Sequence, residues 1–280
     1  LGANEVIPDG AGKGNLTLSP AAGVTATFDL RGYSETINGL TATSAGNVVI
    51  DNTGAGAATF TFGAADVAVA VGGGGGTFTV ANTGAGNLSL TKTGNTSATI
   101  PLTGTTLGHR GATTVTGGGT LVVAAPLAAT NALNVLGTGS NLSITGGLGA
   151  PAGVTGVRVD GGAFLSFFDG VGTPLTSLTT LNLGAGAGTA TLGLELGSTC
   201  DTLTVSSAAT VANIIKFNLN GVSGLADATT YALLSAPSGL SAGTYQLGSQ
   251  PGGFTAGTLT VTDTLISYTT GSAIISDTYW

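Results

Sequence analysis

The chain has 280 residues, of which 50 are glycine and only 7% are charged, against about a quarter in a typical soluble domain. A mean hydropathy of +0.45 and many Thr, Val and Leu residues exclude a disordered chain, which would be charged and poor in β-branched residues. The net charge is −7 and the six basic residues are scattered, so no nucleic-acid partner is expected, and no apolar run approaches the roughly 18 residues that insertion as a membrane helix needs.

Short β-strands are predicted from the N-terminus onward, because polar and apolar residues alternate in short runs. In the first half of the chain these runs are 14–19, 24–30, 46–51, 59–62, 77–81, 87–92, 120–124 and 141–145. Turn signals such as Asn38-Gly39 and the glycine run 72–76 lie between them. The pattern indicates many strands joined by tight turns.

The second half of the chain continues in the same style, with predicted strands at 154–160, 178–183, 189–196, 202–206, 216–220, 258–263 and 265–269. Segments 127–133 and 225–234 are each long enough for one or two helical turns, although neither has good caps. The composition shifts near residue 198, after which aromatic residues are more frequent. We therefore divide the chain into 1–197, a repetitive part, and 198–280, a β-rich C-terminal section that is either separate or continuous with it.

A Gly-Ala-Gly turn between two short strands recurs along the chain. Two copies, Asn52-Thr-Gly-Ala-Gly56 and Asn82-Thr-Gly-Ala-Gly86, begin thirty residues apart. Periods of roughly 20–50 residues are typical of solenoids and propellers, and a propeller would carry an aromatic signature in each blade. Because aromatic residues make up only 5% of this chain, the predicted fold is all-β, a β-solenoid with roughly 20–28 residues per coil. A β-sandwich is the alternative.

Segment 86–123 contains a recognisable motif. It consists of Gly86-Asn-Leu-Ser-Leu-Thr-Lys-Thr-Gly94, Ile100-Pro-Leu-Thr-Gly104, Gly108-His-Arg-Gly-Ala-Thr-Thr-Val115 and Gly118-Gly-Thr-Leu-Val-Val123. This resembles one copy of the autotransporter-associated β-strand repeat of bacterial surface proteins, with His109 at the usual aromatic position. Segment 217–268 is similar in style to the C-terminal stretches of such proteins. The resemblance implies a β-solenoid at a bacterial cell surface and no catalytic residues.

Candidate catalytic and metal-binding residues are few. His109 is the only histidine, and its Gly-His-Arg-Gly surroundings predict a packed or exposed corner residue rather than part of a Ser-His-Asp site. Cys200 is the only cysteine and is predicted to be a small buried hydrophobe. Asp160 and Asp169 are the acids nearest to Arg158, a set that would resemble a sugar-acid lyase site, but solvated charges are the favoured interpretation. We therefore predict no enzyme activity, no metal and no cofactor.

Both termini carry apolar residues where a soluble solenoid would have a polar cap. The predicted assembly interface consists of Val6, Ile7, Ile274, Ile275, Tyr279 and Trp280. Terminal apolar strands can add to the sheet of another copy, and a head-to-tail contact that does not close on itself makes a filament. The sequence thus predicts an extracellular or cell-surface structural subunit whose partner is itself. Docking of each terminus within its own chain is the alternative, and an adhesin that binds surface glycans is the second candidate function.

Overall fold

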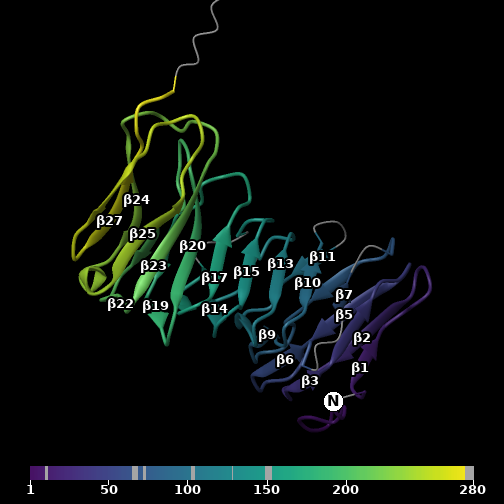
Figure 1. The fold of residues 1–280 in the computed structure, drawn as a ribbon. Helices are drawn as coiled ribbons and strands as arrows, with labels where there is room; N and C mark the ends of the chain where they lie inside the picture. The colour runs from purple at the N-terminus through teal and green to yellow at the C-terminus, as the bar shows by residue number, and fades with distance from the viewer. Residues whose placement is uncertain are drawn as a thin grey trace, which may run out of the picture.

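The protein is a β-solenoid, seen in a computed structural model as an elongated stack of short strands (Figure 1). The structure describes residues 1–9, 12–64, 69–71, 74–101, 105–127, 129–148 and 153–274. Neighbouring strands in each sheet come from different coils and pair in parallel, except in a C-terminal hairpin. The predicted β-solenoid is therefore confirmed, and the β-sandwich, which is built from antiparallel sheets, is wrong.

Two sheets run the length of the stack. Sheet A has 10 strands, in the order β1 (Asn15–Thr17), β4 (Gly39–Ala42), β7 (Val69–Val71), β10 (Ser97–Ile100), β13 (Thr120–Val123), β15 (Asn141–Ile144), β17 (Phe164–Phe167), β20 (Thr189–Leu196), β23 (Ile214–Gly221) and β25 (Thr244–Ser249). Sheet C has 8, in the order β22 (Thr210–Val211), β19 (Thr180–Ala185), β16 (Gly156–Asp160), β14 (Ala132–Leu136), β12 (Ala112–Thr116), β9 (Leu88–Lys92), β6 (Ala58–Phe62) and β3 (Glu35–Ile37). With about 4.8 Å between strands, sheet A alone extends roughly 45 Å.

The third side of the solenoid is built from two shorter sheets. Sheet B has 4 strands, in the order β11 (Thr105–Leu107), β8 (Phe78–Val80), β5 (Asn47–Asp51) and β2 (Thr25–Asp29). Sheet D has 5, in the order β18 (Leu175–Leu178), β21 (Leu203–Val205), β24 (Thr230–Ser235), β27 (Leu265–Thr269) and β26 (Thr258–Val261). Early coils therefore pass through sheets A, B and C, and late coils through A, D and C. Between them, the described residues of the coils at β13 to β16 have a single β-bridge, Leu107 to Leu127, on the third side.

The core lies inside this tube and consists of inward-facing residues stacked in rows. In sheet A, the row through Leu121, Leu142, Leu165 and Leu192 joins partners of successive strands, and each of these side chains has 0% exposure. Phe28 and Phe60 add an aromatic contact, with ring centroids 5.8 Å apart. Because each coil contributes one residue to each row, alternation within a short strand is sufficient to direct its apolar residues inward.

The Gly-Ala-Gly turns are corners of the coil, since they connect strands of different sheets. The turn at Asn52 joins β5 to β6, and the turn at Asn82 joins β8 to β9. The Asn52 amide donates to the carbonyls of Gly56 in its own turn (3.0 Å) and Gly86 in the next (2.9 Å). The same asparagine thus closes one turn and holds it to its neighbour, which explains why the motif recurs about one coil later.

The structure corrects the predicted elements in two respects. The segments 127–133 and 225–234 hold no helical turn in their described residues; they contribute to β14 and β24 instead. A 3-10 turn, η2 (Leu240–Ala242), lies later in the chain, outside both segments. The prediction also missed several short strands, among them β3 and β4 on either side of Asn38 and β7 near the glycine run 72–76, of which residues 72–73 lie outside the described part. Strands of three or four residues show too little alternation to be recognised.

Residues after 197 share the sheets of the preceding part. Sheet A continues through β20, β23 and β25, and sheet C continues from β19 to β22. What changes is the last coil, where β26 and β27 form an antiparallel hairpin that adds to β24. This hairpin and η2 cover part of the C-terminal end, to the left in Figure 1.

Candidate functional site

The structure separates the predicted interface residues. Val6 is 46% exposed and Ile274 is 61% exposed, whereas Ile7 is half-buried against the core. Ile275, Tyr279 and Trp280 lie outside the described residues. Among the described termini, the N-terminal segment is therefore partly docked in its own chain.

Glu35 holds that segment in place. Its carboxylate accepts hydrogen bonds from the backbone N–H groups of Val6 (2.9 Å) and Ile7 (3.0 Å), and its side chain has 0% exposure. Nearby, the N–H of Glu5 donates to the carbonyl of Ser34 at 3.1 Å, and the Glu5 carboxylate accepts from the N–H of Thr36 at 3.2 Å. The segment thus covers the outer edge of β3, the terminal strand of sheet C.

Among the described residues, no strand pairs with the outer edge of sheet A at either end. The terminal strands β1 and β25 each have a sheet neighbour on one side only. Their inward-facing residues Leu16 and Leu247 continue the apolar row of the sheet, because Leu16 pairs with Leu40 and Leu247 pairs with Phe217. Leu40 and Phe217 are fully buried, but Leu16 and Leu247 are only partly buried. Each end therefore presents an unpaired strand edge and an incompletely covered apolar row.

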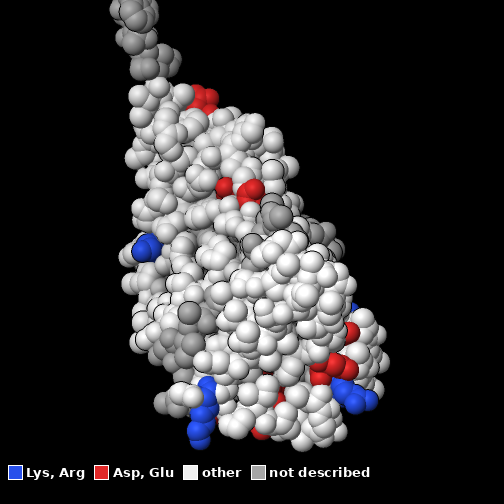
Figure 2. Space-filling model, turned by 90° about the vertical axis from the view of Figure 1, so that its right-hand side faces the viewer, with Lys and Arg blue, Asp and Glu red and all other residues white. Residues whose placement is uncertain are grey.

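The N-terminal end presents apolar residues between its charged ones. Figure 2 shows the side of the molecule on which β1 and β2 lie, and acidic and basic side chains are sparse and scattered over it. Leu18 and Phe28 are partly buried there, and Val24 is 51% exposed. An end with partly exposed apolar residues is suited to contact with another protein surface.

A straight row of polar side chains runs along the outer face of sheet C. Strand pairing joins its members in the order Thr36, Thr61, Thr91, Thr114, Asn134, Arg158, Asn182 and Thr210. Successive members are about 4.8 Å apart, the spacing of paired strands. Among the described strands of sheet C, Arg158 and Asp160 are the only charged residues that face outward.

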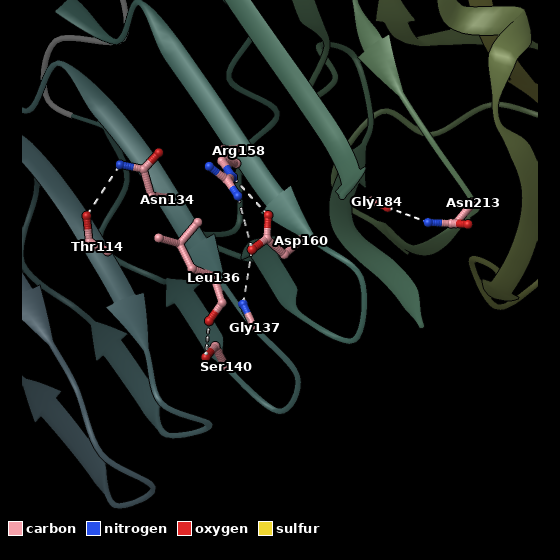
Figure 3. A network of polar contacts seen from close by, with 9 residues as sticks. All are labelled: Thr114, Asn134, Leu136, Gly137, Ser140, Arg158, Asp160, Gly184 and Asn213. Atoms are coloured by element: carbon pink, nitrogen blue, oxygen red, sulfur yellow. Dashed lines mark hydrogen bonds and ion pairs between the residues drawn. The ribbon is translucent and has the colours of Figure 1, made fainter. Parts of the chain in front are cut away.

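A groove of about 300 Å³ lies at the far end of this row, lined by Arg158, Asn182, Leu183, Ala185, Thr210 and Ala212. Arg158 is oriented by Asp160, with Nε to Oδ1 at 2.8 Å, and Asp160 also accepts from the N–H of Gly137 at 3.3 Å. Figure 3 shows Arg158 on the strand next to Asn134, whose amide donates to Thr114 at 3.3 Å. Of the set considered in the sequence, Arg158 and Asp160 form an ion pair, whereas Asp169 lies near Asp201 instead.

His109 is a buried corner residue with 0% exposure. It follows Leu107 by two residues, as Asn82 follows Val80, the partner of Leu107 in β8. Its Nε2 lies 2.8 Å from the hydroxyl of Thr113, while Nδ1 is buried without a hydrogen-bond partner. Burial lowers the pKa of His109 to about 4, so the imidazole is neutral near pH 7.

Carboxylates meet inside the later coils. The Asp201 side chain accepts from the N–H groups of Thr173 and Glu195, both at 2.7 Å. Burial, with smaller effects from Asp169 and Glu195, raises the pKa of Asp201 to about 7. Glu195 in turn accepts from the N–H of Gly170 at 2.7 Å. These bonds tie coils together, and within the described residues no group of three or more His, Cys, Asp or Glu side chains is placed to hold a metal ion.

Cys200 is half-buried rather than fully buried. Its thiol donates to the carbonyl of Ala232 at 3.1 Å and lies 3.0 Å from the hydroxyl of Thr202. Burial raises the pKa of the thiol above its usual value, so a thiolate nucleophile is disfavoured at this position.

Comparison of the chain with protein-family models, with curated proteins and with solved structures finds no match. Within the described residues, no helix is long and apolar enough to cross a membrane. The function must therefore be argued from the geometry of the open sheet ends and the groove. Sequence reasoning predicted apolar, uncapped ends but not that β1 and β25 form them, and it missed the groove. Both depend on which strands lie side by side and not on a local motif.

Proposed function

We propose that this protein is a structural subunit that assembles head to tail at the outside of a bacterial cell. The supporting observation is that sheet A is open at both ends and that Leu16 and Leu247, the last members of the same apolar row, are only partly buried. Placing β25 of one copy beside β1 of the next would continue the parallel sheet and cover both residues. The contact uses different surfaces on the two copies and stacks them along the solenoid, so we propose an open filament and not a closed ring.

The extracellular bacterial location rests on composition and on the resemblance of segment 86–123. The predicted role of the terminal residues is modified in this proposal. Val6 and Ile274 are exposed near the ends and can contribute, but the N-terminal segment already covers β3 within its own chain. The strand edges of β1 and β25 are the principal contact.

The test is electron microscopy and sedimentation of the full chain over a range of concentrations. We expect filaments whose subunit repeat is constant along their length. Leu16→Lys would place a charge in the contact at one end, and Leu247→Lys would do so at the other, so each variant should remain short. Thr99→Lys is the matched control, because Thr99 is exposed in the middle of sheet A and should leave the filaments intact.

A mixture of the two blocked variants distinguishes head-to-tail assembly from other contacts. The free C-terminal end of the Leu16→Lys chain can still bind the free N-terminal end of the Leu247→Lys chain. The mixture should therefore contain dimers that grow no further, whereas each variant alone stays monomeric. Filaments formed by either variant alone, or a monomeric wild-type protein at every concentration, would refute the proposal.

A further inference from the structure

We infer that the groove at Arg158 is a binding site for an acidic polysaccharide, with the Arg158 guanidinium recognising a sugar carboxylate. The groove lies on the outer face of sheet C and reaches β22, one coil before the edge strand β25. The inference uses only residues of sheet C, so it is tested on a chain that cannot assemble. It specifies the ligand class and the residues of the glycan-binding role that the sequence leaves as its second candidate.

The Arg158 guanidinium has hydrogen-bond donors that Asp160 does not use. A guanidinium has five N–H donors, and Asp160 occupies those that point along one side, from Nε at 2.8 Å and from a terminal nitrogen at 3.4 Å. The remaining donors are available, since the Arg158 side chain is 47% exposed. They suffice for a paired contact with a second carboxylate, and Asp160 fixes the geometry in which that contact is offered.

The rest of the groove offers an amide, a hydroxyl and open space. Asn182 and Thr210 follow Arg158 in the outward row, each on the next strand of sheet C. In the described part of the chain, neither side chain is engaged in a hydrogen bond. Ala185 and Ala212 are small, which leaves the groove open beside them. A carboxylate anchor followed by an amide and a hydroxyl at regular spacing fits a sugar acid, which carries a carboxylate and several hydroxyl groups.

The polar row on sheet C favours a polymeric ligand over a single sugar. The row of Thr61, Thr91, Thr114 and Asn134 leads to the groove along the solenoid, while Thr36 beyond it is engaged by Glu5. A linear polysaccharide repeats its hydroxyl groups at regular intervals along a line and can contact many members of such a row. The row contains no aromatic residue on which a neutral sugar ring could stack, so the charged anchor should dominate the affinity.

The experiment measures binding of a short oligogalacturonate, a linear polymer of a carboxylated hexose, by titration calorimetry at low salt. Its fully methyl-esterified form is the ligand control, since it has the same ring and linkage without the charge. We expect binding of the acid form that weakens as salt is added, little binding of the ester, and tighter binding of longer oligomers. The Leu16→Lys chain can be used to keep the protein monomeric during the titration.

Arg158→Ala should reduce the affinity at least tenfold. Arg158→Lys should cause a smaller loss, because a lysine keeps the charge but not the paired hydrogen bonds. Lys13→Ala is the matched control: it removes the same charge from an exposed residue elsewhere and should leave binding unchanged. Far-ultraviolet circular dichroism checks that each variant keeps its fold.

Three outcomes would overturn this inference: absence of binding by the wild-type protein at millimolar oligogalacturonate, equal binding of the acid and ester forms, or unchanged affinity in Arg158→Ala. None of them bears on filament formation, which depends on β1 and β25. Conversely, a protein that stays monomeric could still bind the oligomer with the expected dependence on Arg158.

Discussion

The early and late coils of this solenoid bury the same kind of apolar core but close their third side with different sheets. Coils up to β12 pass through sheets A, B and C and are held at one corner by Asn52 and Asn82. Coils from β17 onward replace sheet B with sheet D and end in an antiparallel hairpin. Sheets A and C are therefore continuous along the solenoid. The third side differs between the early and late coils in its strands, its corner residues and the element that ends it.

The two ends of the solenoid also differ in how their outer strands are covered. At the N-terminal end, β3 is covered by a segment held through side chains, mainly the Glu35 carboxylate. At the C-terminal end, β24 is covered by β27 through backbone pairing. Side-chain capping depends on single residues, whereas a hairpin depends on many backbone hydrogen bonds. Single substitutions should therefore have larger effects on the early coils and their end.

The largest effect is expected at the asparagine-glycine corner of the early coils. A Cβ added to Gly86 would lie 1.9 Å from the carbonyl oxygen of Gly56 in the preceding turn. Neither backbone can move without breaking the Asn52 contacts, so Gly86→Ala should destabilise the protein by about 3 kcal/mol or more. Chemical denaturation measures this loss. Gly252→Ala is the control in the last coil, because nothing lies within 4 Å of its added Cβ, and an equal effect of both substitutions would contradict the corner argument.

The next effect concerns Glu35 and the N-terminal cap. Glu35→Ala removes the acceptor of two backbone N–H groups and should destabilise the cap by about 2–3 kcal/mol. Hydrogen exchange should then show faster exchange at Val6 and Ile7, with little change in β24 and β27. Asp9→Ala is the matched control, since it removes an exposed acid near the end of the same described segment. Unchanged protection of Val6 and Ile7 in Glu35→Ala would show that other contacts hold the segment.

Part of this structure could be predicted from the sequence and part could not. The β-solenoid could be predicted because strand alternation and the Asn-Thr-Gly-Ala-Gly repeat are both local patterns. Strands β20 and β27 match their predicted limits, 189–196 and 265–269, because long alternation and flanking turns mark them. By contrast, the groove needs Arg158, Asn182 and Thr210 to be in register. Coil length varies, from 30 residues between Val48 and Phe78 to 20 between Ala112 and Ala132, so sequence spacing does not give that register.

The smallest effect is a pH dependence of opposite sign in the two regions. His109, in the early coils, has a pKa lowered from 6.5 to about 4 by burial. The unfolded chain therefore binds its proton first, and the contribution of His109 to stability is lost as pH falls from 6.5 towards 4. Asp201, in the late coils, has a pKa raised from 3.8 to about 7, chiefly by burial. Its contribution is present at low pH and is lost as pH rises from 3.8 towards 7.

Two variants separate these contributions, which partly cancel in the wild-type protein between pH 4 and 6.5. The measurement is the free energy of unfolding at several pH values, taken as the difference between each variant and the wild type. Relative to the wild type, His109→Asn, which restores the residue found at the equivalent corner position of Asn82, should gain stability as pH falls. Relative to the wild type, Asp201→Asn should lose stability as pH falls, because the wild-type carboxyl becomes protonated. Differences that do not vary with pH would mean that neither group titrates with a shifted pKa, and differences of the same sign would place one of the two groups in the wrong environment.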